Sequence, residues 1–412
     1  MLLAGSTLMT VSGSQSNLIA FGDIDAASRQ QIERCLDAAG ESSRGVLCAD
    51  HHKGYSMPIG GVVASSDVVM PAGVGYDIGC GNAAVQTGLT AAHVDVKRVM
   101  EQIWRALSFG MGQNNDERIK EHPVFDAIDQ SPVKEQRKLL SLARGQLGTV
   151  GGGNHYVDLF EDRADGSLWV GVHFGSRGLG HKTASGFLSL ASGLKWDQRP
   201  NDSMDAPPSV IELGTPLADD YLAAMNIAGD YAYAGRDWVV DRVLRILQAE
   251  AKQRVHNHHN FAWWETHNGR KTLVVRKGAT PAFPGQKGFI GGSMGDDAVI
   301  VEGVDSPASR AALYSTVHGA GRVMSRTQAA GKINRRTGKQ IAPGKVNWPK
   351  WQYQLKEKGI ELRGGGADEA PECYKDLKQV LAAHGDTIKI LHTLRPIGVA
   401  MAGKDTVDPY RD

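Results

Sequence analysis

The sequence has no apolar run that approaches the roughly 18 residues needed to cross a bilayer, so it predicts no transmembrane helix. Its N-terminus, MLLAGSTLMTVSGSQSNLIAFG, lacks a basic region and is interrupted by Gly and Ser, unlike a signal peptide. Cysteine is also scarce, and Cys35, Cys48, Cys80 and Cys373 show no paired spacing, which argues against a disulfide scaffold. We therefore expect a cytoplasmic protein with reduced thiols and no membrane partner.

Net charge is almost absent, because 46 Lys and Arg residues face 45 Asp and Glu residues. This balance excludes a protein that holds nucleic acid by bulk charge, although it leaves room for a local basic groove. The hydrophobic fraction of 41% excludes wholesale disorder. Glycine, in contrast, is abundant at 50 of 412 residues, against a typical fraction of about 7%. Without a collagen period, these glycines indicate tight turns and close backbone approaches.

Hydrophobic periodicity indicates a mixture of helices and strands without a repeat. Helices are expected at 23–40, 99–107, 134–143, 218–251 and through most of 359–391. Asp25 is expected to cap the first of these, and Gly229 and Gly235 to weaken the long one. Strand-like runs broken by Gly-rich loops are expected at 45–65, 69–87, 147–181 and 272–303. Because length alone allows about two or three domains, the spread of chemical motifs from about residue 50 to 404 is what favours one composite catalytic unit.

Five residues form a possible metal-binding set. Asp77 and Cys80 share a D-x-x-C turn, His155 follows GGGN, His173 ends a strand, and His259 lies in HNHHN. Borderline divalent ions accept carboxylate, thiolate and imidazole ligands, and a bridging thiolate would place two ions side by side. The alternative is that each histidine is a hydrogen-bonded loop residue and that Cys80 is a small buried hydrophobe.

Four glycine loops, GGGNH, GSRGLGH, PGQKGFIGGSMG and HGAGR, can expose backbone N–H groups in the nests that bind phosphates. None matches a Walker A or a Rossmann fingerprint, and each loop alone is also compatible with an ordinary tight turn. Since all four carry His, Ser, Arg or Lys, together they favour a phosphate-rich ligand.

His318 lies in STVHGAGRVMSR, followed by Arg322 and Arg326. Cationic neighbours would favour the neutral, nucleophilic imidazole and attract a phosphate, and a histidine can carry a phosphoryl or nucleotidyl group. The alternative is a structural histidine at a helix start.

The segment 331–359 is strongly basic and contains Trp348, Trp351 and Tyr353. This combination suits binding of single-stranded nucleic acid. The alternative is a solvated loop with buried Trp anchors.

Taken together, these segments resemble the RtcB family of RNA ligases, and the resemblance extends from about residue 48 to the C-terminus. The motifs that carry it are DHHKGYSMPIGGV, PAGVGYDIGCG, GTVGGGNHYVD, VHFGSRGLGH, HHNFAWWE, VVRKGATPAFPGQKGFIGGSMG, HGAGRVMSR and GGGADEAPECYKD. The resemblance implies a single compact α+β domain over residues 1–412, with a core at about 48–404. It implies an enzyme that joins RNA 3′-phosphate or 2′,3′-cyclic-phosphate ends to 5′-hydroxyl ends, using GTP and two Mn²⁺ ions, in RNA repair or tRNA splicing.

The resemblance also implies roles for individual residues. His318 falls on the histidine that takes GMP, and the metal-ligand positions are Asp77, Cys80, His155, His173 and His259, with Cys80 as the bridge. The positions beside the guanylate are Asn154, Asp158, Ser293, Gly319, Ala320, Gly321, Arg322 and Tyr374. An archease-like activating protein is a further partner that the resemblance suggests.

Two positions depart from the family pattern. Asp158 stands where the family usually has Glu, so the carboxylate is one methylene shorter. Met401 stands where the family commonly has a lysine that contacts guanine, and Lys404 is the nearest substitute. We therefore hypothesise a divergent branch that serves RNA repair rather than tRNA splicing. The hypothesis would be wrong if the protein joined a broken tRNA as well as, or better than, other cleaved RNAs.

Two other functions compete with RNA ligation. A metal-dependent phosphoesterase or cyclic phosphodiesterase acting on RNA ends would need the ions but not His318 with Arg322. A non-catalytic RNA-binding protein would use segment 331–359 and would not need Cys80 together with three scattered histidines.

Overall fold

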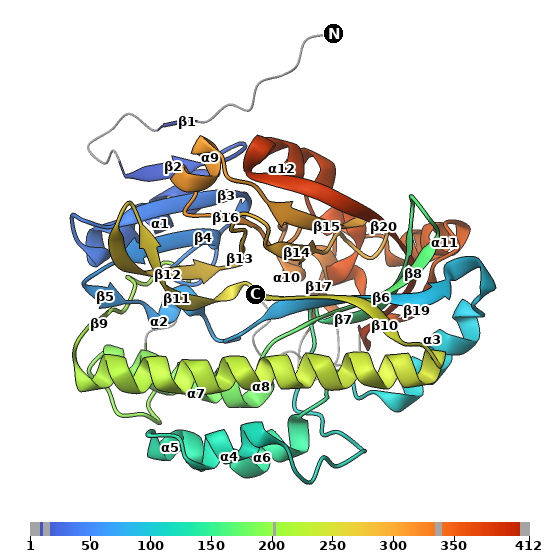
Figure 1. The fold of residues 1–412 in the computed structure, drawn as a ribbon, viewed down its shortest axis with the longest axis horizontal. Coiled ribbons are helices and arrows are strands. Elements are labelled where there is room, and N and C mark those ends of the chain that lie inside the picture. Colours follow the sequence, from blue (N-terminus) through green and yellow to red (C-terminus); the bar gives the residue numbers. More distant parts are fainter. Residues whose placement is uncertain (1–8, 11–16, 201–202, 334–339, 404–412) are drawn as a thin grey trace.

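The computed structural model describes residues 9–10, 17–200, 203–333 and 340–403 of the chain. It is a mixed α+β structure, as the sequence predicts, with two main sheets and helices around them (Figure 1). None of the helices within the described residues has both the length and the hydropathy to cross a bilayer. The prediction of one catalytic domain with a core at about 48–404 stays a prediction.

The larger sheet is antiparallel along its main path and draws strands from distant parts of the chain. Its strands, in order across the sheet, are β10 (Ala251–His258), β6 (Gly81–Thr90), β8 (Ser167–Phe174), β7 (Tyr156–Asp162), β20 (Ile388–Gly403), β15 (Ala298–Gly303) and β14 (Lys287–Ile290). A further strand, β19 (Glu361–Gly365), pairs with β20 in parallel. The sheet therefore aligns segments that are up to about 300 residues apart in sequence, which only tertiary pairing can do.

The second sheet combines N-terminal strands with two strands from the middle of the chain. In order they are β1 (Met9–Thr10), β2 (Leu18–Ala20), β3 (Arg44–His52), β4 (Ile59–Ser65), β12 (Arg270–Lys277) and β11 (Asn260–His267). Short pairs join β5 (Val68–Val69) to β9 (Ile211–Glu212), β13 (Ala279–Pro281) to β16 (Ser315–Val317), and β17 (Gly331–Ile333) to β18 (Gln340–Pro343). The connection from β10 in the first sheet to β11 in the second places a short turn between the two sheets.

The longest helix, α8 (Pro216–Leu247), runs beneath both sheets (Figure 1). Tyr221 and Met225 in its first half share a buried cluster with Val275 of the second sheet. Val243 in its second half packs with Val170 of the larger sheet. The helix predicted at 218–251 is thus confirmed, and it stops at Leu247 because Gln248 adopts a left-handed conformation.

The remaining helices surround this framework. They are α1 (Ala26–Ala39), α2 (Pro71–Val74), α3 (Val96–Ala106), α4 (Pro123–Asp129), α5 (Lys134–Arg137), α6 (Leu140–Gln146), α7 (Arg177–Ala191), α9 (Pro307–Ala311), α10 (Arg326–Ala330), α11 (Trp348–Glu357) and α12 (Leu377–Ala383). The predicted cap of α1 is confirmed, since Asp25 accepts a hydrogen bond of 2.8 Å from the backbone N–H of Ser28. The single helix expected at 134–143 is wrong, because the chain breaks there into α5 and α6.

The helix expected through most of 359–391 is also wrong. Only α12 is α-helical there, whereas β19 lies before it and β20 begins at Ile388. The physical reason is long-range pairing: Glu361 is in register with Gly398, a partner that no local pattern reveals. Gly364 and Gly365 have φ of 70° and 73°, a backbone conformation that does not continue a helix.

Gly229 does more than weaken the middle of α8. A Cβ at this position would lie 2.6 Å from Cε2 of Phe261 and 3.3 Å from Nε2 of His258. The missing side chain therefore lets α8 approach the segment that joins the two sheets.

We expect Gly229→Ala to lower the free energy of unfolding by about 1–3 kcal/mol, the usual cost of overpacking, despite the better helix propensity of alanine. Thermal or urea unfolding measures this change. Gly235→Ala is the matched control, because its Cβ would lie 3.3 Å from the nearest neighbour, Cε2 of Phe174. Equal stability of the two variants would contradict a special close approach at Gly229.

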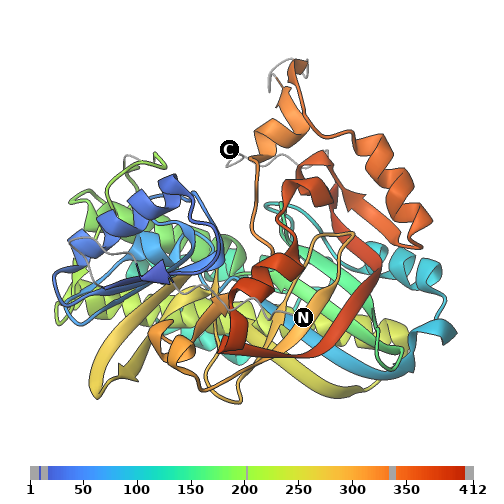
Figure 2. The same ribbon diagram turned by 90° about the horizontal axis from the view of Figure 1, so that it is seen from above.

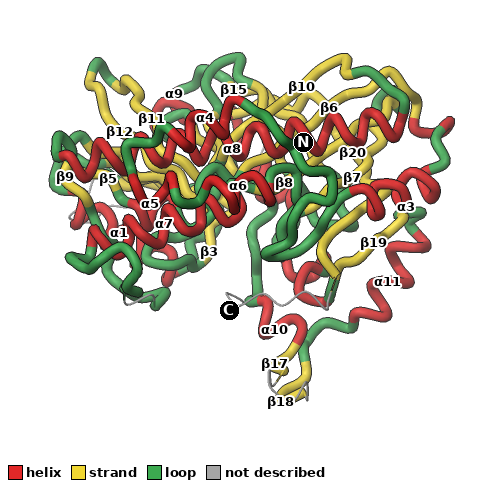
Figure 3. The backbone as a smooth tube through the Cα atoms, turned by 90° about the horizontal axis from the view of Figure 1, so that it is seen from below, coloured by secondary structure: helices red, strands yellow, loops and turns green. Residues whose placement is uncertain are grey.

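The basic and aromatic segment begins in an arm that projects from the rest of the molecule in Figures 2 and 3 and is formed by β17 and β18 together with the preceding helix α10. The segment ends in α11, which packs back against β19. Trp348 and Trp351 are partly buried against small hydrophobic clusters, but they lie on the helix α11 rather than on the loop that the alternative interpretation expected. Tyr353 is 65% exposed. The predicted basic residues Lys332, Lys345 and Lys350 are exposed, whereas Arg335, Arg336 and Lys339 lie outside the described residues.

Candidate active site

The predicted metal ligands meet where the ends of four adjacent strands of the larger sheet lie side by side. Cys80 precedes β6, His155 precedes β7, His173 lies in β8, and His259 follows β10. These four strands are adjacent and antiparallel, so that strand starts lie beside strand ends: Gly81 is in register with both Phe174 and His258, and Tyr156 with His173. Sheet register thus gathers side chains that the sequence scatters over 180 residues (80 to 259).

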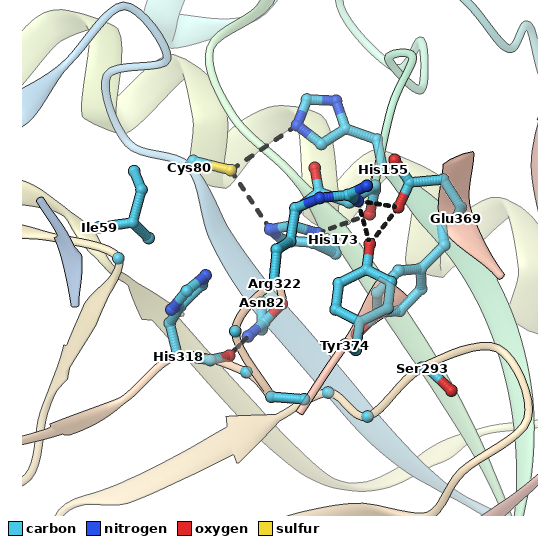
Figure 4. Close-up of a pocket in the computed structure, with 18 of the residues that line it drawn as sticks. Ile59, Cys80, Asn82, His155, His173, Ser293, His318, Arg322, Glu369 and Tyr374 are labelled. Atoms are coloured by element: carbon cyan, nitrogen blue, oxygen red, sulfur yellow. Dashed lines mark hydrogen bonds and ion pairs between the residues drawn. The ribbon is translucent and has the colours of Figure 1, made fainter. Parts of the chain in front are cut away.

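The five side chains form two groups that share one sulfur. Figure 4 shows this sulfur, on Cys80, between His155 of one group and His173 of the other. In the first, Sγ of Cys80 lies 3.3 Å from Nε2 of His173, which is 3.3 Å from Nε2 of His259. In the second, Sγ of Cys80 lies 3.7 Å from Nε2 of His155, which is 3.1 Å from Oδ2 of Asp77. Within each group the ligand atoms lie within 4.8 Å of one another. This geometry suits two cations bridged by the Cys80 sulfur.

The protonation states of this cluster fit metal ligation. Burial, with the charge of His155, lowers the pKa of His173 to about 3, and burial also holds the pKa of His259 well below its ordinary value. Both rings are therefore neutral and offer a lone pair. Burial opposes ionisation of Asp77, but its hydrogen bond and charge interaction with His155 outweigh this and lower its pKa to about 2. Burial and Asp77 raise the pKa of the Cys80 thiol, a shift that a coordinated cation would reverse.

His318 follows β16 and faces this cluster, with its ring centroid 4.8 Å from that of His259. Its Nδ1 lies 2.6 Å from Oδ2 of Asp50, which also accepts a 3.1 Å hydrogen bond from the His318 backbone N–H. Burial would raise the pKa of Asp50, but the charge and hydrogen bonds of His318 outweigh it and the pKa is lowered. Asp50 therefore accepts a hydrogen bond from Nδ1–H of His318, which keeps the ring proton on Nδ1 and leaves the lone pair on Nε2.

The two arginines predicted beside His318 are bonded elsewhere. Glu369, which is 4% exposed, pairs with Arg322 at 3.2 Å and with Arg326 at 3.0 Å. Tyr374 accepts a 3.0 Å hydrogen bond from Arg322 and donates its hydroxyl proton to Glu369. The charged group hydrogen-bonded to His318 is thus Asp50, and the arginines form a separate anchored cluster at the same cavity.

A cavity of about 270 Å³ joins the two clusters. Every predicted site residue within the described chain lines it: Asp77, Cys80, Asn154, His155, Asp158, His173, His259, Ser293, His318, Gly319, Ala320, Gly321, Arg322 and Tyr374. Lys404 lies outside the described residues. Of the four glycine loops, PGQKGFIGGSMG and HGAGR contribute glycines to this lining, whereas GSRGLGH forms the first turn of α7.

One end of the cavity carries buried polar atoms without partners. Among the described residues, neither Oδ1 of Asp158 nor the Tyr156 hydroxyl has a hydrogen-bond partner. Burial raises the pKa of Asp158 well above its ordinary value. Met401 lines the same end, since it is in register with Tyr156 across β20 and β7. Buried polar atoms without partners are rare, so Oδ1 of Asp158 and the Tyr156 hydroxyl are available to hydrogen-bond a molecule in this cavity.

Sequence reasoning missed Asp50 and Glu369 as site residues. Both lie inside the motifs DHHKGYSMPIGGV and GGGADEAPECYKD, so a search of these motifs for further carboxylates could have found them. Asn82, whose Nδ2 donates to the carbonyl of His318 at 3.4 Å, had no comparable signal.

Comparison with known proteins agrees with this geometry. The profile of the family described as "tRNA-splicing ligase RtcB" matches residues 31–132 and 117–402. An Escherichia coli K12 protein named RNA-splicing ligase RtcB is 31% identical over 409 residues, covering 91% of this chain and 94% of that protein. A tRNA-splicing ligase RtcB of Aeropyrum pernix is 30% identical, covering 86% of this chain and 87% of that protein. One of Pyrobaculum aerophilum is 31% identical with the same coverage. With its motifs assembled around one cavity and nearly its whole length matched, this chain belongs to the tRNA-splicing ligase RtcB family.

Proposed function

We propose that this protein is an RNA ligase that joins 3′-phosphate or 2′,3′-cyclic-phosphate ends to 5′-hydroxyl ends through a guanylylated His318, with GTP and two Mn²⁺ ions. The observation that carries the proposal is the placement of His318, oriented by Asp50, against the shared-cysteine cluster in one cavity. Family membership and the names of the relatives support the same activity. RNA is thus the expected substrate.

The donor set fits two divalent ions. Cys80, His173 and His259 would hold one, and Asp77, Cys80 and His155 the other. Sulfur, nitrogen and oxygen donors together are typical of borderline cations, and the choice of Mn²⁺ rests on the family. Bound ions would neutralise the negative charge of the phosphates.

His318 would supply the nucleophile. Its Nε2 attacks the α-phosphorus of GTP, so that an N–P bond forms while the bond to the departing pyrophosphate breaks. Asp50 retains the Nδ1 proton and stabilises the charge that develops on the ring. A 2′,3′-cyclic phosphate would first be opened by water to a 3′-phosphate. An oxygen of the RNA 3′-phosphate would then attack the phosphorus of the GMP group, which breaks the bond to Nε2 of His318. In the last step the 5′-hydroxyl oxygen would attack the activated 3′-phosphate and form the phosphodiester bond, while GMP leaves and the hydroxyl proton is lost to solvent.

The nucleotide would lie toward the end of the cavity formed by Asp158, Tyr156 and Met401. The partnerless Oδ1 of Asp158 can meet the Watson–Crick edge of a base, and Met401 offers an apolar contact in place of a lysine. Selection of guanine is the part of the proposal that these departures from the family pattern affect most. Service in RNA repair, an archease-like activating partner and a cytoplasmic location stay predictions.

Intact-protein mass spectrometry after incubation with Mn²⁺ and either GTP or ATP tests the proposal. We expect an adduct with the mass of GMP. Adding RNA with 3′-phosphate and 5′-hydroxyl ends should remove the adduct and yield a joined RNA product. An AMP adduct instead would show that Asp158 and Met401 have changed base selection. The absence of either adduct, with phosphate still released from RNA ends, would favour the phosphoesterase alternative.

Asp50→Asn is expected to slow adduct formation by up to about 10⁴-fold, the effect of removing a carboxylate that orients a catalytic imidazole. An amide that presents its NH₂ group to Nδ1 moves the ring proton to Nε2 and removes the lone pair there. Single-turnover rates with GTP measure the loss. Unchanged Mn²⁺ binding is the control, and an unchanged rate would contradict the assigned role of Asp50.

A further inference from the structure

Arg236, in the second half of α8, is fully buried. Among the residues that the structure describes, its guanidinium donates to two carbonyl oxygens and one imidazole, lies beside the imidazole of His258, and is hydrogen-bonded to no carboxylate. Burial lowers its pKa to about 10, which still leaves the guanidinium charged at neutral pH. A buried charge without a carboxylate partner is costly, so its retention calls for a specific reason.

The contacts of Arg236 reach three separate segments. Nη1 donates to the carbonyl oxygen of Gly79 at 2.8 Å and also to that of Phe174. Nη2 lies 2.9 Å from Nδ1 of His258, and Nε donates to Nε2 of His256 at 2.7 Å. The planar fork thus fixes the turn before β6, the end of β8 and the end of β10 relative to one another.

Each of these segments carries a predicted metal ligand next to the contact. Gly79 precedes Cys80, Phe174 follows His173, and His258 precedes His259. These three ligands are the members of the buried group, Cys80–His173–His259. Two ligands belong only to the other group. His155 has no contacted residue near it in the sequence, whereas Asp77 lies two residues before Gly79. Arg236 thus contacts a residue near one unshared ligand of that group, against two of the buried group.

We propose that Arg236 is a positioning residue for the metal site formed by Cys80, His173 and His259, acting on that site more than on the one that contains Asp77 and His155. The inference rests on the proposed function, which supplies the ions. Residues that hydrogen-bond to metal ligands set the orientation of those ligands. Losing such a residue typically lowers metal affinity by about 10- to 100-fold. Arg236 does this through the backbone beside three ligands at once.

The test is a titration of the full-length protein with Mn²⁺ alone, followed by electron paramagnetic resonance or equilibrium dialysis. In Arg236→Lys and Arg236→Met, we expect one of the two ions to bind about 10- to 100-fold more weakly. The other ion, which shares only Cys80 with the affected site, should be weakened less. With Co²⁺ as a second probe, the visible bands of the affected site should change, because they report coordination geometry. Lysine keeps the charge but lacks the fork, so it separates geometry from charge.

Arg254→Met is the matched control. Arg254 lies on β10 and pairs with Asp237 and Asp241 of α8, so the variant removes a cation between the same two elements without touching a ligand neighbour. In a His259→Ala background, Arg236→Met should weaken ion binding less than it does in the wild-type protein, since the two changes act mainly on one site.

Several outcomes would overturn the proposal. Equal weakening of both ions, additive effects in the double variant, or loss of the fold in both Arg236 variants would identify Arg236 as a general structural residue. If the wild-type protein binds two ions and the Arg236 variants bind them equally well, the role of Arg236 is contradicted but the proposed function is not. A wild-type protein that binds no Mn²⁺ would contradict the proposed function itself.

Discussion

Replacing His318 with alanine is expected to abolish the GMP adduct and RNA joining, while both Mn²⁺ ions still bind. The loss should be on the order of 10⁶-fold, the scale on which removal of a covalent nucleophile acts. Asp50 orients the ring of His318, and none of the predicted metal ligands is removed by the change. Intact mass after incubation with GTP and Mn²⁺, and electrophoresis of a labelled RNA pair, measure the two activities.

A second histidine–aspartate pair provides a matched control. His392 lies 2.6 Å from Asp162, the distance found between His318 and Asp50, but neither residue lines the cavity. His392→Ala should therefore keep the adduct. If His318→Ala retained a GMP adduct, another residue would be the nucleophile, and if it retained full phosphate release from RNA ends, the phosphoesterase alternative would gain.

Replacing Cys80 with alanine is the second change with a large expected effect, because its sulfur belongs to both ligand groups. We expect the affinity for both ions to fall by more than the roughly 100-fold that loss of an outer partner can cost. His155→Ala and His259→Ala should each weaken one ion chiefly, since each ring belongs to one group. Mn²⁺ titration of the three variants compares these losses directly.

Cys48→Ala controls for the loss of a buried thiol, since Cys48 is fully buried in a hydrophobic cluster and does not line the cavity. It should bind both ions and form the adduct. Retention of two tightly bound ions in Cys80→Ala would rule out the shared sulfur and require two independent sites.

Much of the local structure follows from local sequence. The Asp25 cap and the apolar positions of α1 were sufficient to predict its extent, because a helix of this length is specified by its own residues. The strand in GVLCAD was equally visible, since apolar and β-branched residues cluster there. The segment 359–391 was predicted poorly, because β19 exists only by pairing with β20.

The sequence by itself determined which chemical groups are present: a D-x-x-C turn, isolated histidines, glycine loops and the motifs that resemble the RtcB family. Those motifs carry family identity because their residues and order survive in the linear chain. The sequence could not show which groups touch, since ligands more than 70 residues apart meet only through sheet register.

Tertiary structure alone decided the division of labour within the site. It assigned Asp50 rather than the arginines to His318, and it tied Arg322 and Arg326 to Glu369. It also directed Arg236 from the middle of a long helix onto the backbone beside three ligands. The physical reason is that hydrogen bonds and metal ligation depend on distances of about 3 Å between atoms, and those distances are set by how sheets and helices pack.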